Sequence, residues 1–179
     1  MNRRKFLKVS TLGGGLLAVA GGAAWFSISE ANGPLTIESL LERLSHISES
    51  SFDARGEWDL AKILIHGAQS VEYSIEGYPQ HKSDLFKSTV GSLAFAMFES
   101  KKKMTHGLNE AIPGAPEIVV GQSLDNALGR LEKSLLDFKN FQGKLAPHFA
   151  YGELNKAQYS LAHVMHFNNH WSEVSPVSV

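Results

Sequence analysis

The 179-residue chain has no cysteine and almost no net charge. The absence of cysteine excludes disulfides, thiolate metal ligands, a cysteine nucleophile and a CxxC redox site. Lys and Arg total 17 and Asp and Glu total 18, for a formal charge of −1. A nucleic-acid-binding protein usually has a basic surplus, so this class is excluded as a first expectation. Glycine-rich phosphate loops and GxSxG nucleophile elbows are also missing. The length suits one domain and is too short for a barrel enzyme of about 250 residues.

The first 31 residues differ in composition from the rest. Their only charged residues are Arg3, Arg4, Lys5, Lys8 and Glu30, whereas residues 32–179 carry a charge of −4 and all eight histidines. The 21 residues from Val9 to Ser29 have no charge. Basic residues, then an apolar stretch, then small residues are typical of an export signal. A plain membrane anchor is the alternative, because about 20 apolar residues can span a bilayer.

The segment at residues 2–8, NRRKFLK, resembles the twin-arginine signal motif. The resemblance implies a partner, the twin-arginine export machinery, which carries proteins that have folded before they cross the membrane. We therefore expect a periplasmic or exported protein, with a signal or anchor over residues 1–31 and one domain over residues 32–179. Small residues at 18–20 and 29–31 are the candidate cleavage sites. If neither is cut, the segment would stay in the inner membrane as a tether.

Apolar residues recur at helical spacing through the rest of the chain. The pattern predicts helices over about residues 36–44, 57–75, 83–104, 123–141 and 155–173. Residues 48–56 are predicted to form a polar loop, and no strand pattern of useful length is present. The segment 105–122 is long for a helix connection, and loops of that size are often functional. The predicted fold is all-α: an up-and-down four-helix bundle with an additional helix, preceded by a signal helix.

Three histidines, His163, His166 and His170, share one stripe of the last predicted helix. His166 and His170 are four residues apart, which lets two imidazoles converge on one ion. Neutral imidazole is a good ligand for zinc, nickel, iron or copper. A third ligand must come from another helix, and His66, which lies among apolar residues, is the best candidate. Taken alone, however, His66 is better interpreted as a core histidine bonded to a carbonyl or to Tyr73.

Two segments resemble the domain-of-unknown-function 1569 family, which belongs to the DinB-like metal-binding bundles. They are residues 65–79, IHGAQSVEYSIEGYP, and residues 149–159, FAYGELNKAQY, followed by the HxxxH pair at 166 and 170. The resemblance covers about residues 36–173. It implies a DinB-like bundle in which His66, His166 and His170 hold a divalent ion. The chain departs from the family pattern next to these ligands, at Asn169, at Tyr159 and at residues 171–173.

The function expected from these features is that of an exported metal-dependent enzyme acting on an unknown small molecule. By resemblance, a thiol-dependent transferase or isomerase is implied, and the ion would also suit a hydrolase. The resemblance further implies a homodimer. The alternative is a non-enzymatic metal-binding or structural interaction bundle, and a third interpretation is that the histidines only pack in the core.

No catalytic residue is identified by the sequence. Glu72 or Glu57 would be a general base if one of them faced an open position of the metal. His163 is a candidate for a group beside the ligands or a proton shuttle, and the alternative is a histidine that only packs. Asn169, Gln69, Tyr73 and Glu72 are weaker candidates for a group beside the ligands. The remaining histidines lie in polar or loop contexts without a partner at ligand spacing, so no role is assigned to His46, His81, His106 and His148.

Overall fold

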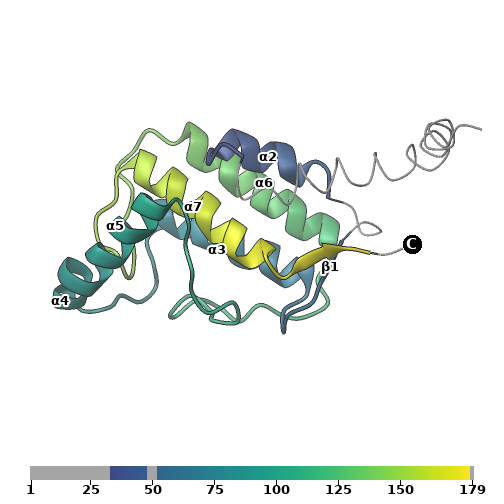
Figure 1. Cartoon of the computed structure of the whole chain (residues 1–179), viewed down its shortest axis with the longest axis horizontal. Helices are drawn as coiled ribbons and strands as arrows, with labels where there is room; N and C mark the ends of the chain where they lie inside the picture. Colours follow the sequence, from purple (N-terminus) through teal and green to yellow (C-terminus); the bar gives the residue numbers. More distant parts are fainter. Residues whose placement is uncertain (1–32, 48–51, 178–179) are drawn as a thin grey trace, which may run out of the picture.

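A computed structural model of the chain describes residues 33–47 and 52–177 (Figure 1). The described part is mostly helical, as predicted. Its longer helices are α2 (Ile37–Leu44), α3 (Leu60–Glu76), α5 (Ser92–Lys101), α6 (Leu124–Asn140) and α7 (Lys156–Trp171). Each helix within these ranges is too short or too polar to span a bilayer. The predicted signal, residues 1–31, lies outside the described residues.

Helix α3 is the centre of the core. It packs against α6 along one side and against α7 along another, while α2 contacts both α6 and α7 (Figure 1). Side chains on most of the α3 surface are therefore buried, from Leu60 to Ser74. A helix that is apolar nearly all round is expected to be buried. The few polar side chains of α3 are consequently the ones that must find partners inside the protein.

Side-chain caps set where the long helices begin. Asp59 Oδ1 accepts a hydrogen bond from the Lys62 backbone N–H at 2.7 Å, so α3 begins at Leu60 rather than near residue 57. Asn155 and Gln158 form a reciprocal capping box at the start of α7, with N···O distances of 2.9 and 3.0 Å. These caps fix the start of the two helices that carry the candidate metal ligands.

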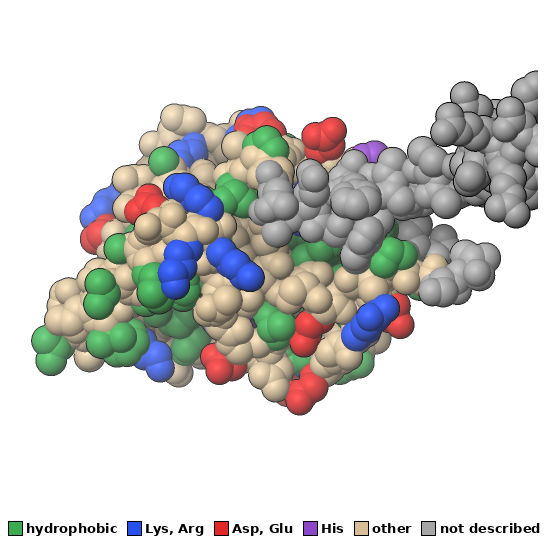
Figure 2. Space-filling view, in the orientation of Figure 1, with side chains coloured by type: hydrophobic (Ala, Val, Ile, Leu, Met, Phe, Trp, Pro, Cys, Tyr) green, Lys and Arg blue, Asp and Glu red, His purple; other side chains and the backbone are tan. Residues whose placement is uncertain are grey.

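The third predicted helix is divided in the structure. A short α4 (Asp84–Phe86) leads into a π-helical turn, η2 (Lys87–Gly91), and then into α5. A Cβ atom on Gly91 would lie 1.9 Å from the Ala150 carbonyl oxygen, so only glycine allows this close approach. The outer face of the segment stays exposed (Figure 2). Its exposed apolar side chains include Leu85 at 74% and Leu93 at 71%.

A two-stranded antiparallel sheet corrects the prediction of a purely helical fold with a loop over residues 48–56. Strand β1 (Phe52–Ala54) pairs with β2 (Val174–Pro176). Strands of three residues are too short to show an alternating pattern. Their partners are also about 120 residues apart in the sequence, so no local signal predicts the pairing. The sheet holds the end of α7 beside the segment that leads into α3.

Candidate metal centre

The three predicted ligands lie together in the structure. His66 is on α3, and His166 and His170 are one turn apart on α7. The Nε2 atom of His166 lies 3.1 Å from Nε2 of His66 and 3.2 Å from Nε2 of His170. His66 and His170 are each only 2% exposed, and His166 is partly exposed. The three histidines could thus hold one metal ion.

The spacing of these nitrogens fits a shared ion better than hydrogen bonds alone. A neutral imidazole carries a single N–H, so Nε2 of His166 can donate to one neighbour at most. Two nitrogens bound to one tetrahedral zinc at about 2.0–2.1 Å would lie about 3.3 Å apart. The observed distances of 3.1 and 3.2 Å are close to that value. A divalent ion at the centre would therefore satisfy all three lone pairs at once.

Burial keeps these imidazoles neutral. It lowers the pKa of His66 to about 4, with smaller contributions from His106 and Lys62. Burial likewise lowers the pKa of His170 to about 3, and that of His166 well below its usual value. Neutral rings keep a lone pair available at pH 7, which is the form that binds metal.

Trp58 packs against two of the three ligand rings. Its indole stacks on His170 with ring centroids 5.7 Å apart and planes at 8°, and meets the edge of His66 at 5.0 Å. The Nδ1 atoms of His66 and His170 are buried and form no hydrogen bond within the described part of the chain. Aromatic packing therefore orients these rings where a carboxylate or carbonyl partner is more usual.

His106 is a fourth imidazole beside the ligands, and the sequence did not indicate it. Its ring centroid lies 4.8 Å from that of His166 and 5.1 Å from that of His170. His106 Nδ1–H donates to the Gly107 carbonyl at 2.7 Å, which leaves Nε2 unprotonated. That Nε2 atom is buried and has no partner among the described residues. Asn169 on α7 helps to hold the His106 backbone in place, because its Nδ2 donates to the His106 carbonyl at 3.3 Å.

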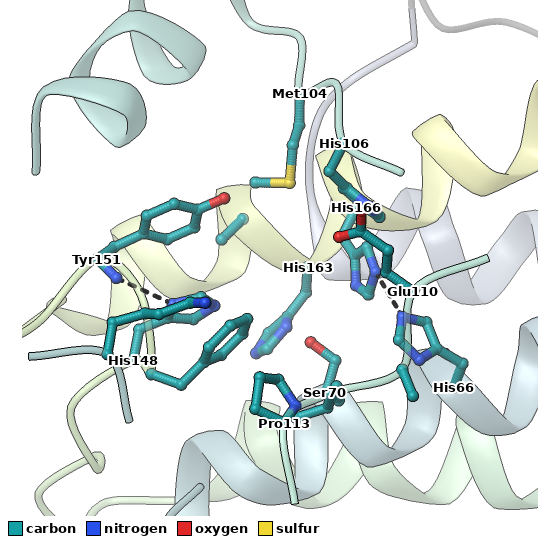
Figure 3. Close-up of a pocket in the computed structure, with 15 residues that line it drawn as sticks. His66, Ser70, Met104, His106, Glu110, Pro113, His148, Tyr151, His163 and His166 are labelled. Atoms are coloured by element: carbon teal, nitrogen blue, oxygen red, sulfur yellow. Dashed lines mark hydrogen bonds between the residues drawn. The ribbon is translucent and has the colours of Figure 1, made fainter. Parts of the chain in front are cut away.

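A cavity of about 180 Å³ adjoins the three histidines (Figure 3). His66 and His166 line it, whereas His170 does not. The predicted functional loop, residues 105–122, forms part of the wall through His106, Glu110 and Pro113. An ion held by the three histidines would thus face the cavity on one side and the protein core on the other.

The carboxylates proposed as bases do not face this cavity. Glu72 accepts hydrogen bonds from Arg130 at 2.9 and 2.7 Å, and Ser134 donates to it at 3.0 Å. Glu57 accepts from the side chain of Asn109 at 2.9 Å. Glu110 lies on the cavity wall instead, near His166 in Figure 3. The length of the 105–122 loop was the one sequence signal that pointed toward it.

The other candidates near the metal take different positions. His163 lines the cavity, with its Nε2 atom 3.3 Å from Ser74 Oγ, and is not one of the three converging ligands. Gln69 Nε2 donates to the Pro116 carbonyl at 3.3 Å and so ties α3 to the loop. The Tyr73 ring packs on Tyr78, with centroids 5.8 Å apart.

The comparisons with known proteins agree with this site only at the level of the family. No curated protein and no solved structure matches the chain. A family model described as "Protein of unknown function (DUF1569)" matches residues 32–177, which include all three candidate ligands. The chain belongs to the DUF1569 family.

Proposed function

We propose that this protein is a metal-dependent enzyme in which His66, His166 and His170 hold one divalent ion beside a small substrate cavity. The observation that carries the proposal is the convergence of three imidazoles at the wall of a cavity, with His166 Nε2 at 3.1 Å from Nε2 of His66 and 3.2 Å from Nε2 of His170. Catalytic sites commonly use three protein ligands and keep a further position for water or substrate. The donor set of imidazoles suits zinc, nickel or iron.

The reaction that fits this site best is hydrolysis or transfer to a thiol. When bound, a divalent ion would polarise the substrate or lower the pKa of a nucleophile. The chain supplies acceptors for the nucleophile's proton on the same wall, the Glu110 carboxylate and the His106 Nε2 lone pair. The absence of cysteine means that any thiol would have to come from a small molecule.

We also propose that the helices form a DinB-like four-helix bundle and that the protein is exported. The contacts of α3 and α2 with both α6 and α7 support the first proposal. The paired arginines at 3 and 4, and the 21 uncharged residues that follow Lys8, support export by the twin-arginine machinery to the periplasm. The homodimer that the family resemblance implies stays a prediction.

Metal content is the test of this proposal. We expect about one divalent ion per chain in the purified protein, by mass spectrometry, and loss of that ion in His166→Ala. His46→Ala is the matched control, because His46 is exposed and has no place at the site. A folded protein that takes up neither zinc nor nickel would contradict the proposal. Bound metal that leaves no position open to exogenous ligands would favour the non-enzymatic alternative.

A further inference from the structure

Two histidines outside the metal ligand set line the same cavity. They are His148, on the turn before α7, and His163, on α7 itself. Their side chains are 8% and 4% exposed. Figure 3 shows His163 in the middle of the cavity and His148 beside Tyr151, on the side away from His66. Buried imidazoles need hydrogen-bond partners, so the partners they have reveal which nitrogen carries the proton.

The backbone fixes the tautomer of His148. Its Nδ1 atom accepts hydrogen bonds from the N–H groups of Ala150 and Tyr151 at 3.1 and 3.2 Å. Nδ1 is therefore unprotonated, and the neutral ring carries its proton on Nε2. The ring is held flat against Tyr151, with centroids 4.2 Å apart and planes at 8°. Its Nε2–H has no acceptor in the described residues.

A serine fixes the tautomer of His163. The Ser74 hydroxyl donates to the Val71 carbonyl at 2.6 Å, so its one proton is used there. The Ser74 oxygen can then only accept from His163, whose Nε2 lies 3.3 Å away. His163 thus carries its proton on Nε2 and keeps a lone pair on Nδ1. No donor in the described parts of the chain reaches that lone pair.

We propose that His148 Nε2–H and His163 Nδ1 form a donor–acceptor pair that binds an uncharged polar group of the substrate, with a primary amide as the best match. An amide offers a carbonyl oxygen to the His148 donor and an N–H to the His163 acceptor. The inference rests on the proposed function, because it takes this cavity as the substrate site. The amide would be the recognised group, at a distance from the groups that react near His66 and His166.

The electrostatics of the pair favour an uncharged group over a carboxylate. Burial lowers the pKa of both histidines to about 3, so neither ring carries a charge at pH 7. A carboxylate has acceptors only and would face the His163 lone pair without a proton to share. Among the described residues that line the cavity, Lys82 is the one lysine or arginine, and it is exposed to solvent. In the metal-free protein an anionic substrate would depend on that lysine, so the two cases are separable there by experiment.

The size of the cavity limits the substrate further. Its volume of about 180 Å³ is below the roughly 300 Å³ at which sites for drug-sized ligands begin. Figure 3 places the Ser70 hydroxyl between His163 and His66. A molecule bound by His148 and His163 would therefore extend past Ser70 toward His66 and His166. A short chain with an amide at one end fits these limits.

The test combines the tautomers with the binding of a matched pair of probes. Nitrogen-15 NMR of histidine side chains should show both His148 and His163 with the proton on Nε2 at pH 7. Butanamide should bind and shift both rings, and butanoate should bind at least tenfold more weakly. The two probes are compared on the full chain without metal, because a bound divalent ion would itself attract the carboxylate. Butanamide binding is then measured again after zinc is added.

Two variants remove one cavity atom each and keep the structural hydrogen bonds. His148→Asn keeps an acceptor for the backbone N–H groups and loses the donor in the cavity. His163→Gln keeps an N–H donor for Ser74, but its one acceptor, the amide oxygen, no longer lies at the position of the ring Nδ1. Each should weaken butanamide binding about fivefold, in line with the loss of one hydrogen bond. Lys82→Gln is the control and should leave butanamide binding unchanged.

Several results would overturn the inference. If the NMR measurement places the proton on Nδ1 of either histidine, the donor–acceptor pair does not exist. This measurement is made on the unsubstituted protein, so it does not depend on whether the variants fold. Tighter binding of butanoate that is lost in Lys82→Gln would identify an anion site instead. Amide binding by a protein that takes up no zinc would contradict the proposed metal-dependent function but not this inference. Zinc uptake without amide binding would contradict this inference but not the proposed function.

Discussion

Four of the buried or partly buried histidines differ in whether the backbone holds one of their ring nitrogens. His106 and His148 each have one nitrogen fixed by the backbone, through Gly107 in the first case and Ala150 and Tyr151 in the second. His66 and His170 have no such partner among residues 33–47 and 52–177, and both pack against Trp58. The backbone-bonded rings are therefore held in one tautomer, while the ligand rings are free to adopt the tautomer that a metal requires.

At the residue scale we predict that His106 supports metal binding without being one of the converging ligands. Its ring lies beside those of His166 and His170, and its buried Nε2 lone pair would be available to a group bound at an open position of the ion. His106→Ala should lower metal affinity about tenfold and leave one ion per chain, because removing such a partner typically costs 10- to 100-fold. Competition with a chromogenic chelator measures this affinity.

His81→Ala is the control for that measurement, since His81 is exposed and does not line the cavity. Unchanged affinity in His106→Ala would show that the ring only packs. Complete loss of the ion would show that it coordinates directly.

The sequence predicted that His66, His166 and His170 come together, but it did not predict the groups around them. His166 and His170 were found from their spacing on one helix, and His66 from its apolar surroundings together with the family resemblance. His106, Glu110 and His148 are on irregular segments, where no periodicity relates sequence position to direction in space. Trp58 precedes α3, and its contact with His170 crosses more than 100 residues of chain.

At the scale of elements, the caps made the helices predictable. Asp59, Ser123 and Asn155 each accept a hydrogen bond from the backbone three residues later, and the predicted helix starts agree with them to within a few residues. The π turn η2 and the β1–β2 pair were not predictable in the same way. Both depend on contacts with distant segments, Ala150 in one case and the opposite end of the chain in the other.

A matched pair of glycines tests the packing of the α4–α5 segment. Gly91→Ala should destabilise the fold by about 1–3 kcal/mol, because the new methyl would overlap the Ala150 carbonyl and push η2 from the turn that holds His148. Gly129→Ala, on α6, has open space around its Cβ and should be neutral or stabilise by up to about 1 kcal/mol. Urea unfolding of both variants measures the difference. If the Gly91→Ala and Gly129→Ala variants are equally stable, the close contact of Gly91 with the Ala150 carbonyl is not needed for the fold.

At the scale of the whole molecule, the fold gathers histidines from four segments of the chain around one cavity. Helix α3 contributes His66, helix α7 contributes His163 and His166, and two connecting segments contribute His106 and His148 (Figure 3). The β1–β2 pair and the packing of α3 against α7 bring these segments together. We interpret one end of the cavity as the metal centre and the other as the recognition site.

X-ray absorption spectroscopy of the zinc-loaded protein is the most direct measurement of the central claim, that three histidines hold one ion with a position open to the cavity. The account predicts three imidazole nitrogens at about 2.0–2.1 Å and at least one oxygen from solvent in the same shell. His166→Ala should lose this signature, and His46→Ala should retain it. A shell without imidazoles, or one closed by four imidazoles with no solvent oxygen, would contradict the account.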